Sequence, residues 1–256
     1  MRKNVILFGA MLMMASSAMA QSSQGGIRNA TLQQIVKAQN GSANKALFNA
    51  IANNNIDDLV KNPANQAPVD THFSIETPKQ SIHNQKSSGR CWMFSGFNVL
   101  RSNFAKNDKQ GRVVEFSQDY LFFYDQLEKA NLMLQGVIDT GKKSIEDPQV
   151  QFFFKNPIND GGTFCGVADL AEKYGLAPMS AQPETFSSNN TSKMSKLISS
   201  KLREYGLELR KMVAQGKKSS AIQARKDEML ATVYHMLSLT LGEPVKEFTY
   251  AFRDKD

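Results

Sequence analysis

The chain has 256 residues, of which 41% are hydrophobic, and its 31 basic and 24 acidic residues give a formal net charge of +7. This composition is typical of a globular protein. The basic pairs at 142–143, 217–218 and 225–226 lie near acidic residues or on predicted helix faces, which argues against a nucleic-acid partner.

The first residues have the pattern of a leader for export. Arg2 and Lys3 are basic, residues 5–14 are apolar, and residues 18–20 (Ala-Met-Ala) form a small-x-small cleavage site. The apolar run is too short to span a bilayer comfortably. There is no Cys near the cleavage site to which a lipid could be attached. We therefore expect cleavage after Ala20, export to the periplasm or the extracellular space, and no membrane contact beyond that of the leader.

The segment that follows the leader is predicted to contain two short helices. Apolar residues recur with a helical period over 27–39 and 43–52. Asn-rich and Pro-containing stretches around and after them indicate loops. Residues 71–77 alternate apolar and polar side chains, which predicts a strand leading into the next segment.

A cysteine six positions after a glutamine opens the next predicted helix. The apolar residues after Cys91 recur at i, i+4, i+7 and i+11 and form one helical stripe: Met93, Phe97, Leu100 and Phe104. A thiolate that attacks a carbonyl needs hydrogen-bond donors about 3 Å from the oxyanion. Gln85 supplies a side-chain amide and Cys91 its own backbone N–H, so we interpret Cys91 as a nucleophile and Gln85 as an oxyanion donor.

Two alternatives to a nucleophile are open for Cys91. The first is a buried, inert cysteine, since free Cys is among the most buried residue types. The second is a disulfide with Cys165, the other cysteine of the chain. The Gln85 spacing, Trp92 and the helix start favour the nucleophile, because unpaired N–H groups and the helix dipole stabilise a thiolate.

Long helices dominate the rest of the chain. Ser117 is a predicted N-cap for a helix with Tyr120, Phe123, Tyr124, Leu127 and Leu134 on one side. The aromatic run at 120–124 is interpreted as packing, and a helix at 167–174 is expected to close at Gly175.

Two amphipathic helices are predicted from residue 192 onward, joined by a polar link at 216–220. The first apolar stripe comprises Met194, Leu197, Ile198, Leu202, Tyr205, Leu209 and Met212. The second comprises Ile222, Met229, Val233, Met236, Leu237 and Leu241. These patterns predict a helical hairpin packed on the core.

Four separated segments resemble one family. The Gln–x5–Cys–Trp–x–Phe–Ser pattern resembles papain-like cysteine peptidases, and the string NQKSSGRCWMF resembles their bleomycin hydrolase and aminopeptidase C branch (peptidase C1B). The other segments are EFSQDYLFFYDQLEKAN, NDGGTF with EKYGLAP, and LGEPVKEFTYAFRDKD. The resemblance runs from about residue 44 to the last residue.

The resemblance implies an α+β, papain-like fold. This chain would be its helix-rich N-terminal part with a long helical hairpin insertion, and the β-barrel half would be largely missing. The implied activity is that of a thiol protease, a cysteine aminopeptidase that removes N-terminal residues from peptides through an acyl-enzyme. Cys91 and Gln85 would be catalytic, and Gly161 and Gly162 would pair with the substrate backbone.

The resemblance also implies partners, and at two places this sequence departs from the patterns of related families. It implies peptide substrates with a free N-terminus, a homo-oligomer (a hexamer), and neither cofactor nor metal. Ser88 and Asn159 replace a disulfide of plant relatives, so that bridge is absent. Residues 163–165 (Thr-Phe-Cys) replace a Gln-Trp-Asp stretch of the branch, so the pocket details are not carried over.

The general base of such an enzyme is a His oriented by an Asn or Asp. His235 lies 144 residues after Cys91 but inside a predicted helix, and His83 lies on the oxyanion segment. His72 is the third candidate, and a packing or surface role is the better interpretation for each of the three; no Cys or acidic pair near them has zinc-ligand spacing. We therefore expect that the chain is incomplete, that the catalytic His and Asn lie in a continuation, and that alone it has little peptidase activity.

The predicted organisation has four parts: a signal peptide at 1–20, an N-terminal extension at 21–78, a papain-like nucleophile part at 79–185, and the hairpin insertion with the start of the second half at 186–256. The alternative function is that of a catalytically dead, truncated peptidase-fold protein that binds peptides or serves as an assembly subunit.

Overall fold

The computed structural model describes residues 26–38, 44–65, 68–109 and 112–251. The chain divides into two compact units, Met1–Phe73 and Ser74–Asp256, which are described separately. The predicted leader at 1–20 lies outside the described residues. Within the described residues, no helix is both long enough and apolar enough to cross a membrane.

The first unit consists of short helices. They are α2 (Asn29–Ala38), α3 (Asn44–Asn53), α4 (Ile56–Leu59) and the 3₁₀ helix η1 (Pro63–Asn65). The helices predicted at 27–39 and 43–52 are thus confirmed within the described residues. None of the described residues of this unit is buried, and Phe48 exposes 67% of its surface.

The strand predicted at 71–77 is wrong, because these residues adopt no regular structure. A strand requires a hydrogen-bonded neighbour. The β structure in the described residues comprises two isolated bridges, Ser87 with Asn190 and Phe116 with Pro178, and neither includes residues 71–77. The apolar and polar alternation is therefore not matched by a partner strand.

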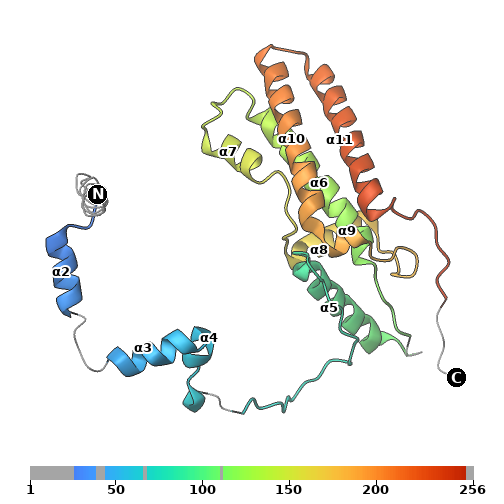
Figure 1. The fold of residues 1–256 in the computed structure, drawn as a ribbon. Helices are drawn as coiled ribbons and strands as arrows, with labels where there is room; N and C mark the ends of the chain where they lie inside the picture. The colour runs from blue at the N-terminus through green and yellow to red at the C-terminus, as the bar shows by residue number, and fades with distance from the viewer. Residues whose placement is uncertain (1–25, 39–43, 66–67, 110–111, 252–256) are drawn as a thin grey trace, which may run out of the picture. The chain divides into compact units, whose positions relative to one another are not determined.

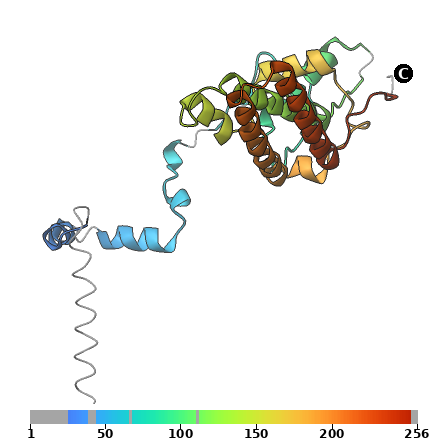
Figure 2. The same ribbon diagram turned by 90° about the horizontal axis from the view of Figure 1, so that it is seen from above.

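The second unit is built around one long helix, α6 (Gln118–Asp139) (Figure 1). The helices α10 (Thr191–Ala214) and α11 (Ser219–Leu241) pack against α6 and against each other, as the view along the hairpin also shows (Figure 2). The predicted hairpin is confirmed, and Gly216, with φ of +66°, lies in its link. Of the predicted stripes, Leu202 and Val233 are fully buried, whereas Leu197 is 53% exposed.

The start of α6 follows the predicted capping pattern. Ser117 is the N-cap, and its side chain accepts a hydrogen bond from the Tyr120 N–H. The aromatic run contributes to the core: Phe122 and Phe123 are fully buried, and Tyr124 stacks on Tyr174 with ring centroids 4.0 Å apart. The interpretation of these rings as packing is confirmed.

Four shorter helices surround this core. The first, α5 (Cys91–Asn107), packs against α8 (Phe164–Tyr174). The others, α7 (Pro148–Lys155) and α9 (Phe186–Asn189), contact α6 and the hairpin respectively. The helix predicted at 167–174 begins three residues earlier, at Phe164, because Thr163 caps it, and it ends at Gly175 as predicted. This arrangement places the start of α5 beside the segment that leads into α8.

Candidate active site

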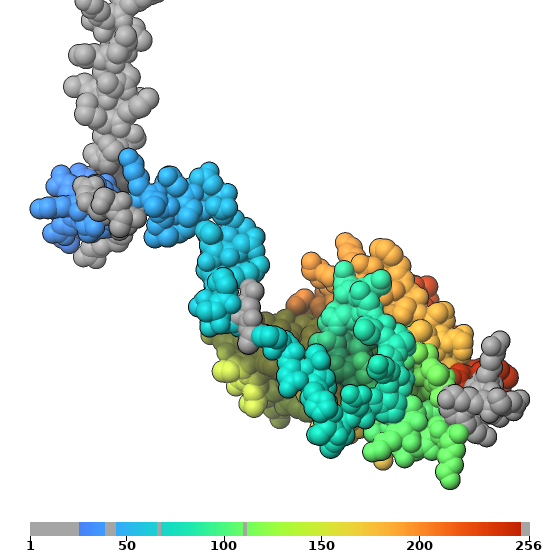
Figure 3. All heavy atoms as spheres, turned by 90° about the horizontal axis from the view of Figure 1, so that it is seen from below, coloured from blue at the N-terminus to red at the C-terminus, as the bar shows by residue number. Residues whose placement is uncertain are grey.

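Cys91 is the first residue of α5, and its thiol is exposed and unpaired. Figure 3 shows the α5 segment, in teal green, at one face of the second unit. Both alternatives are therefore wrong in this structure, since Cys91 is not buried and forms no disulfide with Cys165. The predicted stripe explains the orientation, because Met93 and Phe97 on it are fully buried. Burial of that face leaves the thiol on the outer side of the first turn.

Within the described part of the chain, the backbone N–H of Cys91 itself is an unused hydrogen-bond donor. The first N–H groups of an α-helix have no partner within the helix. Among the described residues, the Cys91 N–H donates to no acceptor. A negatively charged oxygen beside the sulfur would therefore find this donor available and the positive end of the helix dipole nearby.

Gln85 lies in a tight turn that precedes α5. Its Nε2 donates to the Ser88 carbonyl at 2.8 Å, and the Ser88 hydroxyl donates back to the Gln85 carbonyl at 2.7 Å. Between them, Lys86 adopts a left-handed conformation with φ of 55°, and its N–H donates to Asn84 Oδ1 at 2.7 Å. Since a primary amide has two N–H donors, one donor of the Gln85 side chain stays available for a ligand.

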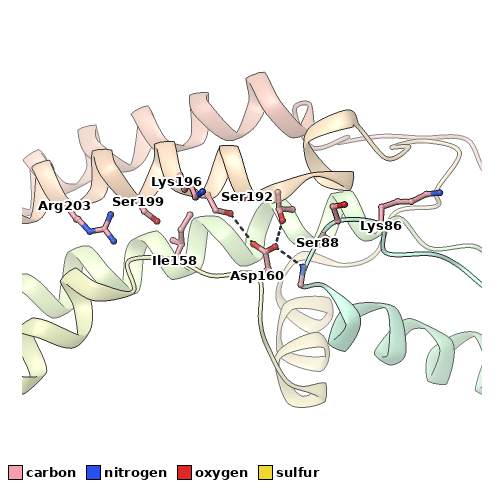
Figure 4. A pocket seen from close by; sticks show the side chains of 12 residues that line it. Lys86, Ser88, Ile158, Asp160, Ser192, Lys196, Ser199 and Arg203 are labelled. Atoms are coloured by element: carbon pink, nitrogen blue, oxygen red, sulfur yellow. Dashed lines mark hydrogen bonds between the residues drawn. The ribbon is translucent and has the colours of Figure 1, made fainter. Parts of the chain in front are cut away.

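Asp160 connects this turn to two other elements (Figure 4). Its Oδ2 accepts from the Gly89 N–H at 3.0 Å and from the Thr191 hydroxyl, and its Oδ1 accepts from the Ser195 hydroxyl at 3.2 Å. Its carbonyl accepts from Trp92 Nε1 at 2.6 Å. One carboxylate thus joins the nucleophile turn, the segment before α8 and the start of α10.

Gly161 and Gly162 directly follow Asp160, and the two glycines have different surroundings. A Cβ at Gly162 would lie 2.5 Å from the Trp92 ring, whereas one at Gly161 would meet only Asn159 Oδ1 at 3.3 Å. The Gly161 carbonyl accepts from Lys129 Nζ at 2.6 Å. The Gly162 N–H and C=O have no hydrogen-bond partner among the described residues, so Gly162 is the better placed of the two to pair with an extended peptide. A role in substrate binding stays a prediction for both.

An ion pair between a buried arginine and a half-buried glutamate involves the residue directly before the nucleophile. Arg90 precedes Cys91 and is fully buried, and its Nη1 and Nη2 donate to the two carboxylate oxygens of Glu184 at 3.0 and 2.7 Å. Its Nε donates to the Ser88 hydroxyl at 3.1 Å. Sequence reasoning missed this pair. Its only signal was a charged residue directly before the apolar stripe of a predicted core helix.

A carboxyl group lies in the same buried region. Asp119, in the first turn of α6, is fully buried, and its Oδ2 accepts from Gln182 Nε2 at 3.1 Å while Oδ1 has no partner. Burial raises the pKa of Asp119 to about 7, and the neighbouring Glu184 adds to the rise, whereas the Gln182 bond and Arg90 oppose it. The sequence showed Asp119 only as an acidic residue at a helix start.

None of the three His residues is hydrogen-bonded to Cys91 in the described part of the chain. His83 Nε2 lies 2.8 Å from Glu115 Oε2, and His235 is exposed on α11. His72 is exposed in the first unit. Across the described ranges, no group of three His, Cys, Asp or Glu side chains is arranged to hold a metal ion.

A hollow of about 740 Å³ borders the nucleophile turn (Figure 4). Residues 86–89 and Asp160 line one end, and the α10 side chains line the other as far as Arg203. Cys91, Gln85 and the two glycines are not among its lining residues. The hollow therefore lies beside the candidate active site and does not contain it.

Comparison with known proteins shows close relatives. Residues 27–256 match the Peptidase C1-like family. The chain is similar to aminopeptidase C of Lactobacillus delbrueckii subsp. lactis, with 38% identity over 81% of this chain and 46% of the relative. It is also similar to human bleomycin hydrolase, with 39% identity over 72% of this chain and 41% of the relative. The chain spans about half the length of these curated relatives.

A solved structure supports the same relationship. The chain superposes on PepW from Lactobacillus rhamnosis HN001 with a TM-score of 0.80 and 33% sequence identity, covering 91% of this chain and 54% of that one. The predicted resemblance and the predicted fold, the helix-rich part of a papain-like α+β architecture, are thereby confirmed.

Proposed function

The chain belongs to the Peptidase C1-like family, and on this premise we propose that it supplies the nucleophile side of a cysteine aminopeptidase. The observation that carries the proposal is an exposed, unpaired Cys91 at the first residue of α5, whose N–H has no partner among the described residues. Several relatives are named aminopeptidase C, which supports the choice of a peptidase acting at the N-terminus.

In the proposed reaction, the Cys91 thiolate attacks the carbonyl carbon of the first peptide bond. The carbonyl electron pair moves onto oxygen, which accepts hydrogen bonds from the Cys91 N–H and from the available donor of Gln85. Collapse of this intermediate expels the shortened peptide as an amine and leaves a thioester on Cys91. Water then attacks the thioester carbon, which releases the N-terminal amino acid and restores the thiol.

Two proton transfers in this reaction need a further group. The leaving amine must gain a proton, and the attacking water must lose one, which a His does in this chemistry. No His is bonded to Cys91 in the described residues. We propose that the His and its orienting Asn or Asp belong to the portion of the relatives that this chain does not cover.

The test is an assay of the protein purified from its source cells. We expect it to release the amino acid from aminoacyl arylamides with a free amine and not from their N-acetylated forms. Cys91→Ala should abolish the release, whereas Cys165→Ala, which removes the other exposed thiol, should keep it. Turnover that persists in Cys91→Ala would contradict the proposal.

A second candidate is a peptidase-fold protein that binds peptides without cleaving them, and the observation in its favour is that the Gly162 N–H and C=O have no hydrogen-bond partner among the described residues. Its discriminating result is a protein from source cells with the mass of residues 21–256, with peptide affinity and without turnover. A clearly larger mass together with turnover would support the aminopeptidase and contradict this second candidate.

We further propose that residues 1–20 are removed during export, on the basic, apolar and small-x-small pattern of that segment. The native N-terminus would then be Gln21, and N-terminal sequencing of the protein from the periplasm or the culture medium tests this. A native chain that begins at Met1 would contradict it. A homo-oligomer, such as a hexamer, stays a prediction.

A further inference from the structure

We propose that Arg90 is a positioning residue for the reaction. Through its ion pair with Glu184 and its bond to Ser88, it holds the two oxyanion donors, the Gln85 amide and the Cys91 N–H, in one arrangement. The inference rests on the proposed function, because it assigns Arg90 a role only if Cys91 is the nucleophile.

The Arg90 guanidinium has a fixed position. It is fully buried, and both terminal nitrogens bond the Glu184 carboxylate in a bidentate pair. Its central carbon lies 5.3 Å from the ring centroids of both Phe94 and Phe122. A planar guanidinium held by two parallel bonds and two rings cannot rotate without losing several contacts at once.

From this fixed group, hydrogen bonds lead to Gln85. Arg90 Nε donates to the Ser88 hydroxyl at 3.1 Å, and that hydroxyl donates to the Gln85 carbonyl at 2.7 Å. The Ser88 carbonyl in turn accepts from Gln85 Nε2 at 2.8 Å. The Ser88 hydroxyl is therefore the link between the Arg90–Glu184 ion pair and the turn that orients the Gln85 amide.

The turn needs such a link. Lys86 has a φ of 55°, and a non-glycine residue keeps this conformation only where its surroundings over-determine it. Arg90 is also the N-cap of α5 and makes no side-chain cap bond, so its side chain is committed to the ion pair. One residue thus acts on the Gln85 turn through its side chain and on the Cys91 N–H through its backbone.

The acceptor of the pair is itself anchored far along the chain. Glu184 Oε2 also accepts from the Ser188 hydroxyl at 2.7 Å, within the capping box that starts α9 at Thr185. The Thr185 hydroxyl donates to the Thr240 carbonyl of α11 at 2.9 Å. The pair therefore ties the nucleophile turn to the base of the helical hairpin.

The test separates oxyanion binding from access to the thiol. A peptidyl aldehyde reports on both: the Cys91 thiolate adds to the aldehyde carbon, the carbonyl pair moves onto oxygen, and the proton lost by the thiol returns to that oxygen. Iodoacetamide reports on the thiol alone, since sulfur displaces iodide and no oxyanion forms. A purely structural role would change both readouts together.

The variants are chosen to act at different points of this chain of bonds. Ser88→Ala removes the link and leaves the Arg90–Glu184 pair intact, whereas Arg90→Lys keeps the charge and loses the bidentate geometry. The matched control is Arg225→Lys, because Arg225 also forms a two-bond pair, through Nε and Nη2 to Glu208 at 2.6 and 3.1 Å, on the hairpin.

With the protein as its source cells make it, we expect Ser88→Ala and Arg90→Lys to weaken aldehyde binding about tenfold or more, in line with the large effect of losing one oxyanion donor. Their iodoacetamide rates should stay within about twofold of the parent, and Arg225→Lys should change neither readout. Unchanged aldehyde affinity, or equal losses in both readouts, would overturn the role of Arg90. If Arg90→Lys does not fold, Ser88→Ala decides the question.

Failure of the proposed function gives a different result. The unsubstituted protein from source cells would then bind the aldehyde no more tightly than its Cys91→Ala variant does. That outcome removes the nucleophile assignment and the positioning role with it, whereas normal aldehyde binding by the parent with no effect of Ser88→Ala removes the positioning role alone.

Discussion

Gly161 and Gly162 are adjacent, yet the structure gives only one of them a steric reason to be glycine. A Cβ at Gly162 would lie 2.5 Å from two Trp92 ring atoms, while Gly161 has space for one. We predict that Gly162→Ala lowers the free energy of unfolding by about 1–3 kcal/mol, as overpacking does, and that Gly161→Ala changes it by less than about 0.5 kcal/mol. Urea denaturation measures both, and equal effects would contradict the packing of Trp92 on Gly162.

Asp119 should make stability depend on pH. Burial raises the pKa of its carboxyl from the ordinary 3.8 to about 7 in the folded state. Between these values the unfolded chain loses the proton and the folded chain keeps it, so stability falls as pH rises. This carboxyl alone lowers the free energy of unfolding by about 1.4 kcal/mol for each pH unit between the two pKa values. Above the folded-state pKa, the free energy of unfolding falls no further on account of this group.

We therefore predict that Asp119→Asn gains stability relative to the parent between about pH 4 and pH 7. The measurement is urea denaturation of both proteins across this range. A difference in the free energy of unfolding between the two proteins at pH 4 reflects the hydrogen bonds that the substitution alters. Only the change of this difference with pH reflects the ionisation of the Asp119 carboxyl. A difference that stays constant from pH 4 to pH 8 would show that Asp119 is ionised in the folded protein at low pH.

At the scale of residues, the sequence predicted the local geometry around Cys91 and missed its long-range contacts. Cys91 and Gln85 share one short motif, and the structure places them at the first residue of α5 and in the turn before it, while their catalytic roles stay predictions. Arg90 and Glu184 are 94 residues apart, and no local pattern pairs two charged side chains over that distance. The pairing arises only when the segment before α9 packs against the start of α5.

The helical hairpin provides a test at the scale of elements. Leu202 and Leu197 belong to the same predicted stripe of α10, but Leu202 is fully buried and Leu197 is 53% exposed. We predict that Leu202→Ala lowers the free energy of unfolding by about 2–5 kcal/mol, because it leaves a cavity. Leu197→Ala should change it by less than about 0.5 kcal/mol. Similar losses from both, measured by thermal denaturation, would mean that Leu197 is covered in solution.

Helices were predictable from the sequence because their period and caps are local. The N-cap at Ser117 and the closing Gly175 were both recognisable, and both are confirmed. The strand at 71–77 was not predictable in this way, since a strand depends on a partner that alternation alone does not supply. Leu197 shows a related limit of sequence prediction. An apolar stripe predicts which way a helix faces the core, but it does not predict how many of the residues at the edge of the stripe are buried.

The division of the chain into two units has a measurable consequence at the scale of the molecule. No described residue of Met1–Phe73 is buried, and the buried apolar residues belong to Ser74–Asp256. We predict that residues 74–256 alone unfold in one transition with a midpoint within about 2 °C of that of the longer chain. A midpoint lower by many degrees, measured by calorimetry, would show that the first unit stabilises the second.

The central claim is that Cys91, and not merely an accessible thiol, is the nucleophile. Cys165 is a natural internal control, because it is also exposed and also lies in the first turn of a helix, α8. The most direct measurement is reaction of the protein purified from its source cells with a limiting amount of a peptidyl chloromethyl ketone, followed by mass mapping of the label. We predict modification at Cys91 and none at Cys165, since Cys91 follows the turn that holds the proposed second oxyanion donor, Gln85. Equal labelling of both, or faster labelling of Cys165, would contradict the account.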